Sequence, residues 1–381
     1  MDFNFTEQQE MIRRTVRDIA QKVVAPRAAE IDRTGEYPWD IKDILAKQGL
    51  LGILIPEEYG GIGADLLTVV LVIEELAKVS GSVSTIMVGA VDGVYSMLLA
   101  ANEEQKKRYF PGLATGELGG AIAITEPEAG SDVSGMKTRA VLDRDNYVLD
   151  GVKHFITMGG GQSELFTVYA VTDPERGVKG FSAFIVEREF AGFRTGKPED
   201  KMGMRALPLV DLIMDNCKVP KTNLMGREGD GFKIVMHALE HTRPGVAAQS
   251  LGLAEGALDY AIEYAKTRVQ FGQPIGQFQG IQFMLAEMAT QVEAARYLTY
   301  RAATSLSKGD KEGPRYGSMA KLFASDAAMK VTTDAVQVLG GYGYMKDYPV
   351  ERFMRDAKIT QILVGTNQIQ RVIIGRSLLG Q

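Results

Sequence analysis

The sequence predicts a mainly α-helical protein with a central β domain. Apolar residues recur at helical spacing before residue 118 and again after residue 226. Between these limits the segments are short, alternate apolar with polar residues, and are separated by turn residues, as in a small β domain. We therefore expect an N-terminal helical domain at 1–118, a middle β domain at 119–225 and a C-terminal helical bundle at 226–381.

The first domain contains the clearest helix start. Thr6 and Gln9 form the pattern of a capping box, and the apolar positions that follow it have helical spacing. Two further apolar helices are predicted at 66–78 and 83–101. In the middle domain, the segments 147–149 and 181–186 have the pattern of strands.

The C-terminal region has three long amphipathic patterns at 251–268, 278–307 and 316–339, and a shorter one at 359–379. Four helices with short connections are typical of a four-helix bundle.

Composition excludes several classes of protein. Net charge is -5 without a basic patch, which argues against nucleic-acid binding. No signal or transit pattern and no apolar run of about 18 residues is present, so we expect neither secretion nor a membrane span. Cys217 is the only cysteine, which fits a reducing compartment, and we expect a cytoplasmic protein. His237 and His241 have the spacing of two metal ligands on a helix, but no third ligand lies nearby, so no metal site is predicted.

Five ordered motifs distinguish this chain from a generic helical protein. The first is an apolar strand that opens into a loop of small and hydroxyl residues, where backbone N–H groups can approach a flat polar ring. The set resembles that of the acyl-CoA dehydrogenase family over essentially the whole chain. The motifs are Ile122–Asp132, Lys153–Gly160, Arg268–Gly272 followed by Gln279, Asp334–Gly343, and Tyr348–Lys358.

The resemblance implies a homotetramer of three-domain subunits with a middle β-barrel, and FAD between this barrel and the bundle. Phe155 departs from the family's usual tryptophan but keeps an aromatic ring. The family's FAD contacts correspond to Ile124, Thr125, Gly130, Ser131, Phe155, Thr157, Arg268, Gln270, Phe271, Gln279, Gln337, Gly341, Thr366 and Gln368, with Arg268, Gln270, Phe271, Gln337 and Gly341 reaching a neighbouring subunit's FAD. Substrate contacts are expected at Ser131, Arg243, Leu363, Val364 and Gly365.

The chain departs from the family at the catalytic base. The glutamate that removes the α-proton in most members corresponds to Val364, which cannot accept a proton. The alternative base position of some branches corresponds to Thr242. Glu240 is two residues away and points about 200° round a helix from Thr242, which makes it a poor substitute.

Asp92 is the carboxylate that we expect to replace the missing base. It interrupts an apolar helix that lines the acyl pocket in the family. A buried carboxylate has a raised pKa, as a general base near neutrality requires. The alternative is that Asp92 faces solvent or caps a helix before Gly93.

The combination of Val364 and Asp92 resembles the family's cyclohex-1-ene-1-carboxyl-CoA dehydrogenases. A substrate with a double bond at its α-carbon has no α-proton, but its γ-proton is acidic. The expected reaction is a 1,4-elimination to cyclohexa-1,5-diene-1-carboxyl-CoA, with Asp92 as base and hydride transfer to flavin N5. The enolate would be stabilised by the Val364 N–H and a flavin ribityl hydroxyl.

Three other functions remain open at this point. One is ordinary α,β-dehydrogenation of a saturated acyl-CoA by Asp92 or Glu240, another is a flavin- or CoA-binding protein without activity, and the third is an oxygen-using relative. For the dehydrogenases, the family resemblance implies an electron-transferring flavoprotein as the electron acceptor.

Overall fold

The computed structural model describes residues 5–380. Its N-terminal part is helical, and Thr6 caps the first helix with the predicted capping box to Gln9. The helices predicted at 66–78 and 83–101 are present within one to two residues of these bounds. The helices are α1 (Glu7–Ile19), α2 (Ala28–Thr34), α3 (Trp39–Lys47), α4 (Leu66–Ala77), α5 (Gly81–Ala100) and α6 (Glu103–Thr115).

The middle part is one eight-stranded sheet with the order β6-β7-β3-β2-β4-β5-β8, and β1 pairs in parallel with β4. The longest pairing joins β3 to β7 antiparallel, and its register shifts between Lys153 and Ile156. The strands are β1 (Gly120–Ala123), β2 (Arg139–Asp143), β3 (Asn146–Thr157), β4 (Leu165–Val171), β5 (Phe181–Glu187), β6 (Phe193–Thr195), β7 (Leu209–Pro220) and β8 (Leu224–Met225).

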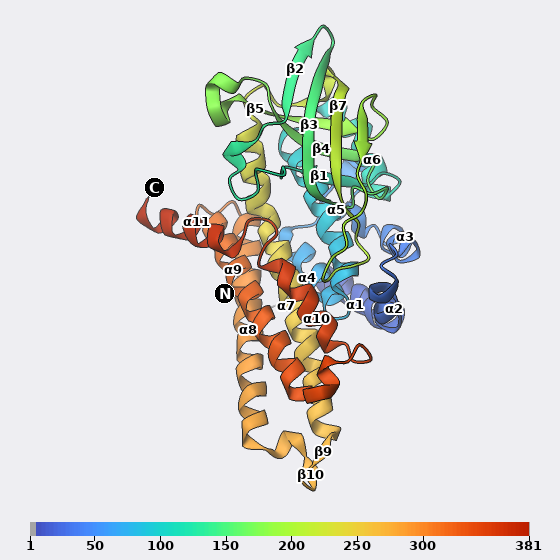
Figure 1. The fold of residues 1–381 in the computed structure, drawn as a ribbon, viewed down its shortest axis with the longest axis vertical. Helices are drawn as coiled ribbons and strands as arrows, with labels where there is room; N and C mark the ends of the chain where they lie inside the picture. The colour runs from blue at the N-terminus through green and yellow to red at the C-terminus, as the bar shows by residue number, and fades with distance from the viewer. Residues whose placement is uncertain (1–4, 381) are drawn as a thin grey trace.

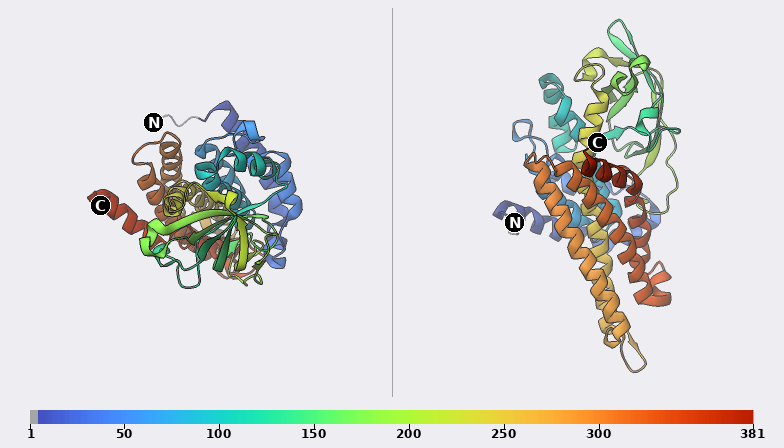
Figure 2. Two further views of the ribbon diagram at one scale, coloured as in Figure 1. Left: turned by 90° about the horizontal axis from the view of Figure 1, so that it is seen from above. Right: turned by 90° about the vertical axis from the view of Figure 1, so that its left-hand side faces the viewer.

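The C-terminal part is a long helical bundle (Figure 1). The sheet and the N-terminal helices gather around one end of the bundle, and a small hairpin lies at the opposite end (Figure 2). The elements are α7 (Gly231–Thr267), β9 (Val269–Gln270), β10 (Gln273–Pro274), α8 (Gln279–Ser307), α9 (Gly313–Leu339), α10 (Val350–Thr360) and α11 (Asn367–Leu379).

Two predicted helices of this region were wrong in extent. The helix predicted at 251–268 begins at Gly231, and Pro244 lies inside it. The helix predicted at 359–379 is two helices, α10 and α11, because Val364 and Gly365 between them have φ values of 53° and 86°. A left-handed backbone cannot continue a right-handed helix.

Helix α5 is long and apolar enough to cross a membrane by length and composition, with a mean hydropathy of 1.6. In this structure 61% of that apolar stretch is buried inside the protein. The helix packs against α4, α7 and β1. Its composition is therefore that of a central core helix.

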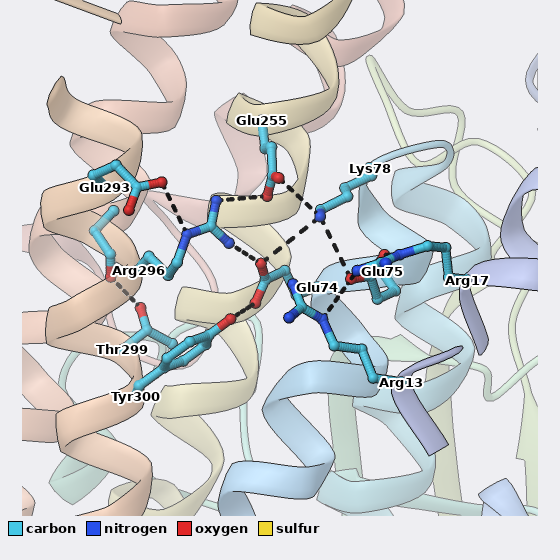
Figure 3. Close-up of polar contacts among 11 residues, drawn as sticks. Arg13, Arg17, Glu74, Glu75, Lys78, Glu255, Glu293, Arg296, Thr299 and Tyr300 are labelled. Carbon is cyan, nitrogen blue, oxygen red and sulfur yellow. Dashed lines mark hydrogen bonds and ion pairs between the residues drawn. The ribbon is translucent and has the colours of Figure 1, made fainter. Parts of the chain in front are cut away.

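A network of buried charges joins the N-terminal helices to the bundle (Figure 3). Glu75 on α4 accepts hydrogen bonds from Arg13 and Arg17 of α1, each with a 2.8 Å contact. The adjacent Glu74 pairs with Arg296 of α8 and accepts a hydrogen bond of 2.6 Å from the Tyr300 hydroxyl. The network fixes α1, α4 and α8 relative to one another. Lys78 and Glu255 complete it.

Candidate active site

Helices α5 and α7 run antiparallel, and contacts at two places fix their register. At one place the Gln249 amide donates to Ser84 Oγ at 3.0 Å and to Thr85 Oγ1 at 2.8 Å. At the other, the rings of Tyr95 and His241 stack with centroids 4.8 Å apart. Positions just before Tyr95 on α5 therefore lie opposite positions just after His241 on α7.

This register places Asp92, one turn before Tyr95, opposite the Thr242–Arg243 step of α7. The Asp92 side chain lies in the middle of α5 and caps no helix. Its Oδ1 is buried and has no hydrogen-bond partner. Burial raises the pKa of Asp92 to about 8. A carboxyl with a buried, unpaired oxygen and a raised pKa fits the expected role of Asp92 as a base.

The segment that we expect to face the flavin packs directly against α5, close to Asp92. Gly89 lies one turn before Asp92, and a Cβ at this position would be 2.6 Å from the Met158 Sδ. Met158 directly follows Thr157, and Phe155 lies three residues earlier in the same expected flavin-facing segment. The close approach at Gly89 therefore brings the candidate base near the segment that would hold the hydride acceptor.

The two other base positions of the family have no usable carboxylate. Thr242 is buried, and its hydroxyl has only a 3.5 Å contact with the Leu239 carbonyl. Glu240 is on the same continuous helix, so the angular argument against it applies. Val364 is half-buried in the loop between α10 and α11.

Arg243 is buried beside these residues. Its Nη1 donates to Ser318 Oγ at 3.1 Å, whereas its Nε is buried without a partner. Burial lowers the pKa of Arg243 to about 10, although Glu240 acts in the opposite direction. A buried guanidinium with an unused donor fits its expected role as a substrate contact.

The Val364 loop has a strained backbone that neighbouring side chains hold in place. A positive φ is rare for a β-branched residue and costs about 1–3 kcal/mol. The Gln370 amide donates to the carbonyls of Val364 and Gly365 at 3.2 and 2.9 Å. Lys321 also donates to the Gly365 carbonyl, at 2.8 Å. The expected substrate contact Leu363 is half-buried in the same loop.

The middle domain holds one group of the expected FAD contacts. The Ile124 carbonyl accepts from Lys153 Nζ at 3.2 Å, and the Thr125 carbonyl accepts from the His154 N–H at 2.8 Å. These bonds hold the end of β1 beside β3. Phe155 has a φ of 58° and is 52% exposed, and Thr157 is half-buried next to it.

Glu126 anchors the loop that carries Gly130 and Ser131. Its carboxylate accepts from the N–H groups of Lys137 and Thr138 and pairs with Lys153 at 2.8 Å. A Cβ added at Gly130 would meet no atom within 4 Å, and Ser131 is exposed. The open loop and the exposed aromatic ring of Phe155 fit a large planar cofactor.

A second group of expected FAD contacts lies at the far end of the bundle. Phe271 in the hairpin is 94% exposed, and the Arg268 guanidinium lies over the Tyr342 ring at 4.9 Å. The hairpin is remote from the sheet (Figure 1). Gln270, Gln279, Gln337 and Gly341 are also exposed. One subunit therefore carries two separated surfaces that both match FAD contacts.

Thr366 and Gln368 stand apart from both groups, at the start of α11. The Thr366 hydroxyl caps this helix by accepting from the Ile369 N–H at 3.3 Å. Gln368 is exposed.

Sequence reasoning missed the buried residues that support the site, Lys321, Lys153 and Gln370. The two lysines are fully buried. A lysine within an apolar run, as in Ala320-Lys321-Leu322-Phe323, is the signal that would have indicated Lys321, because such a charge needs partners. Gln370 gives no comparable signal.

Family models match almost the whole chain. The N-terminal, middle and C-terminal domains of acyl-CoA dehydrogenase match residues 6–117, 121–217 and 229–379. An acyl-CoA dehydrogenase of Bacillus subtilis is 50% identical over 98% of this chain and 99% of its own length. The cyclohex-1-ene-1-carbonyl-CoA dehydrogenases of Syntrophus aciditrophicus and Geobacter metallireducens are both 49% identical, over 98% and 99% of this chain and 90% and 99% of their own.

Solved structures agree with these matches. Butyryl-CoA dehydrogenase from Megasphaera elsdenii has a TM-score of 0.97 and 44% identity, with all of both chains covered. A chain from work on the electron transferring flavoprotein of Acidaminococcus fermentans has a TM-score of 0.98 and 48% identity, also with all of both chains covered. The chain belongs to the acyl-CoA dehydrogenase family, whose members are FAD-dependent oxidoreductases that act on acyl-CoA thioesters.

Proposed function

We propose that this protein catalyses the 1,4-elimination of cyclohex-1-ene-1-carboxyl-CoA to cyclohexa-1,5-diene-1-carboxyl-CoA. One observation carries the proposal. The carboxyl of Asp92 is unpaired, opposite the Thr242 position of α7, whereas Val364 and Thr242 cannot act as bases. We infer that the base acts from α5 and not from the Val364 position beside the α-carbon.

The reaction follows from this inferred position of the base. Asp92 takes the γ-proton from ring carbon C3, and the electrons of that C–H bond form a double bond between C2 and C3. The original C1–C2 double bond shifts to C1–C6 as C6 loses a hydride, which FAD would accept when it is bound. The carboxyl pKa of about 8 makes Asp92 a stronger base than an exposed aspartate.

The comparisons support an acyl-CoA dehydrogenase and do not distinguish between its candidate substrates. Relatives named as cyclohex-1-ene-1-carbonyl-CoA dehydrogenases are as similar as one named only acyl-CoA dehydrogenase. The choice therefore depends on the arrangement of Asp92, Thr242 and Val364 rather than on the names.

The assembly and the electron acceptor belong to the same proposal. The hairpin surface around Phe271 would bind the pyrophosphate end of an FAD whose flavin lies on another copy, because one subunit carries both surfaces at opposite ends. This arrangement supports a homotetramer. An electron-transferring flavoprotein would accept the electrons, as the likeness to a chain from such a system suggests. The expected location remains the cytoplasm.

The decisive experiment replaces Asp92 by asparagine. Asp92→Asn keeps the shape but removes the basicity, so turnover of the cyclic enoyl-CoA should fall by about 10²-fold or more, with FAD content unchanged. Glu240→Gln is the matched control and should remain within a few-fold of the native rate. A fully active Asp92→Asn together with an inactive Glu240→Gln would place the base on α7 and contradict the proposal.

Ordinary α,β-dehydrogenation is the second candidate, because a carboxylate at Asp92 is also available to a saturated substrate whose α-carbon reaches it. Anaerobic mixing with a panel of CoA thioesters separates the two. Bleaching of the flavin by the cyclic enoyl thioester alone supports 1,4-elimination, bleaching by butyryl- or octanoyl-CoA supports the second candidate, and no bleaching indicates an inactive protein. Fast reoxidation of the reduced protein by air would indicate an oxygen-using enzyme.

A further inference from the structure

Lys321 of α9 is a fully buried lysine whose hydrogen bonds all converge on one loop. Its side chain is 0% exposed, and its Nζ donates to the Gly365 carbonyl and to Asn367 Oδ1, both at 2.8 Å. Within residues 5–380 it forms no ion pair. Burying an ammonium group is costly unless it is fully hydrogen-bonded. Its position is thus tied to the segment that contains Val364.

Other side chains hold the same segment from the same side. The Gln370 amide donates to the carbonyls of Val364 and Gly365, and the Asn367 amide donates to Ser325 Oγ at 2.9 Å. The Val364 and Gly365 carbonyls are therefore turned towards α9 and α11. In the described part of the chain, the N–H groups of these two residues have no acceptor. The carbonyls of this loop thus accept hydrogen bonds from the protein, whereas its N–H groups can donate to a ligand.

We propose that Lys321 is a positioning residue that holds the Val364–Gly365 backbone so that the Val364 N–H meets the thioester carbonyl oxygen. The inference rests on the proposed function in one respect, that this N–H stabilises an enolate. A preorganised donor is effective only if it does not move as the charge develops. Lys321 and Gln370 supply this rigidity against the strain of the left-handed Val364.

A ligand that becomes an enolate without turnover tests this role. Acetoacetyl-CoA carries acidic hydrogens between two carbonyl groups, and its enolate stacked on the flavin should give a long-wavelength charge-transfer band whose growth with pH reports an apparent pKa. In Lys321→Met this pKa should rise by about one unit, equivalent to a tenfold weaker preference for the enolate. Turnover should fall by about 10- to 100-fold, as expected for a displaced donor. The ionisation of this ligand needs neither Asp92 nor a cyclic substrate. A negative result in this test would therefore contradict the role of Lys321 without contradicting the proposed reaction.

Matched variants show whether Lys321 acts by holding the loop, by its charge or only by stabilising the fold. Lys330→Met removes a partly exposed lysine of the same helix and should behave as the native protein. Gln370→Met removes a neutral donor to the same carbonyls and should also raise the ligand pKa. A native ligand pKa in Gln370→Met beside a raised one in Lys321→Met would mean that Lys321 acts by charge, and would overturn the positioning role.

A native ligand pKa in an FAD-loaded Lys321→Met would overturn the proposal directly. If Lys321→Met does not fold, Lys321→Gln keeps a polar group in the cavity and should give a smaller rise. No rise in a folded Lys321→Gln would likewise overturn it.

Discussion

Glu75 on α4 and Asp92 on α5 are carboxyl groups in opposite states. Glu75 on α4 is 2% exposed, and although burial raises its pKa, Arg17, Lys78 and Arg13 lower it to about 2. Asp92 on α5 has no such partner, and burial alone raises its pKa to about 8. The first group is permanently charged, whereas the second can gain and lose a proton near neutral pH.

This difference distinguishes a carboxylate that stabilises the fold through ion pairs from one that can act as a base. A fully paired carboxylate, as in Figure 3, is held by its cations and is too weak a base to take a proton from carbon. An unpaired one gains basicity and destabilises the fold at pH values where the unfolded chain ionises it. Burial raises the pKa of both carboxyls, and only Glu75 has neighbouring cations that reverse the shift.

The largest expected effect on stability comes from breaking the paired region. Arg296→Met leaves the fully buried Glu74 without its main partner, and the free energy of unfolding should fall by about 3–5 kcal/mol. Asp92→Asn should leave this free energy unchanged or higher, since no partner is lost. Denaturant unfolding of both variants against the native protein measures the contrast. Equal destabilisation by the two changes would contradict the view that the Glu74 region is stabilised by its ion pairs and that Asp92 is not.

The pH dependence of stability should have opposite signs for the two carboxyls. The pKa of Glu75 is lowered from 4.5 to about 2, so its contribution to stability is present above pH 4.5 and is lost as the pH falls towards 2. The pKa of Asp92 is raised from 3.8 to about 8, so the unfolded chain releases this proton first. Native stability should therefore decline relative to Asp92→Asn between pH 4 and 8, by up to about 1.4 kcal/mol per pH unit.

Denaturant unfolding at several pH values measures the free energy of unfolding across both of these pH ranges. The kinetic counterpart is an acidic limb in kcat/KM, with activity rising as the pH passes about 8, since the base must be ionised. A pH-independent difference between the native protein and Asp92→Asn would mean that Asp92 is not held protonated.

The smallest expected effect is a gain of activity. Val364→Glu places a carboxylate at the family's usual position, beside the α-carbon. A low rate of 1,2-dehydrogenation of cyclohexanecarboxyl-CoA should appear, because this saturated substrate has an α-proton. Flavin bleaching under anaerobic conditions measures it, with Val364→Gln as the uncharged control. Equal rates in the two variants would show that the added carboxylate is not acting as a base.

Much of the fold could be predicted from local patterns. The Thr6 capping box and the apolar periodicity of α4 and α5 depend on neighbours in sequence, and the structure has them. The break between α10 and α11 could not be predicted in this way. Nothing in a single Val-Gly pair signals a left-handed valine, because tertiary contacts from Lys321 and Gln370 hold it.

The candidate site divides similarly. The sequence singled out Asp92 because a charge in an apolar helix is unusual, and the structure adds that its Oδ1 is buried without a partner. The placement of Asp92 opposite Thr242 depends on the α5–α7 register, which the Tyr95–His241 stack and Gln249 fix over a long sequence separation. Its role as base and the roles of the FAD contacts stay predictions.

The left-handed conformation at Val364 has a consequence for how the family can change its chemistry. The strain resides in the main chain and is greatest for a β-branched residue such as valine. The contacts that hold the loop go to its carbonyls and do not involve the Val364 side chain. We therefore expect an unbranched residue such as glutamate at this position to keep the loop's conformation, so that a change of reaction there would cost the fold little.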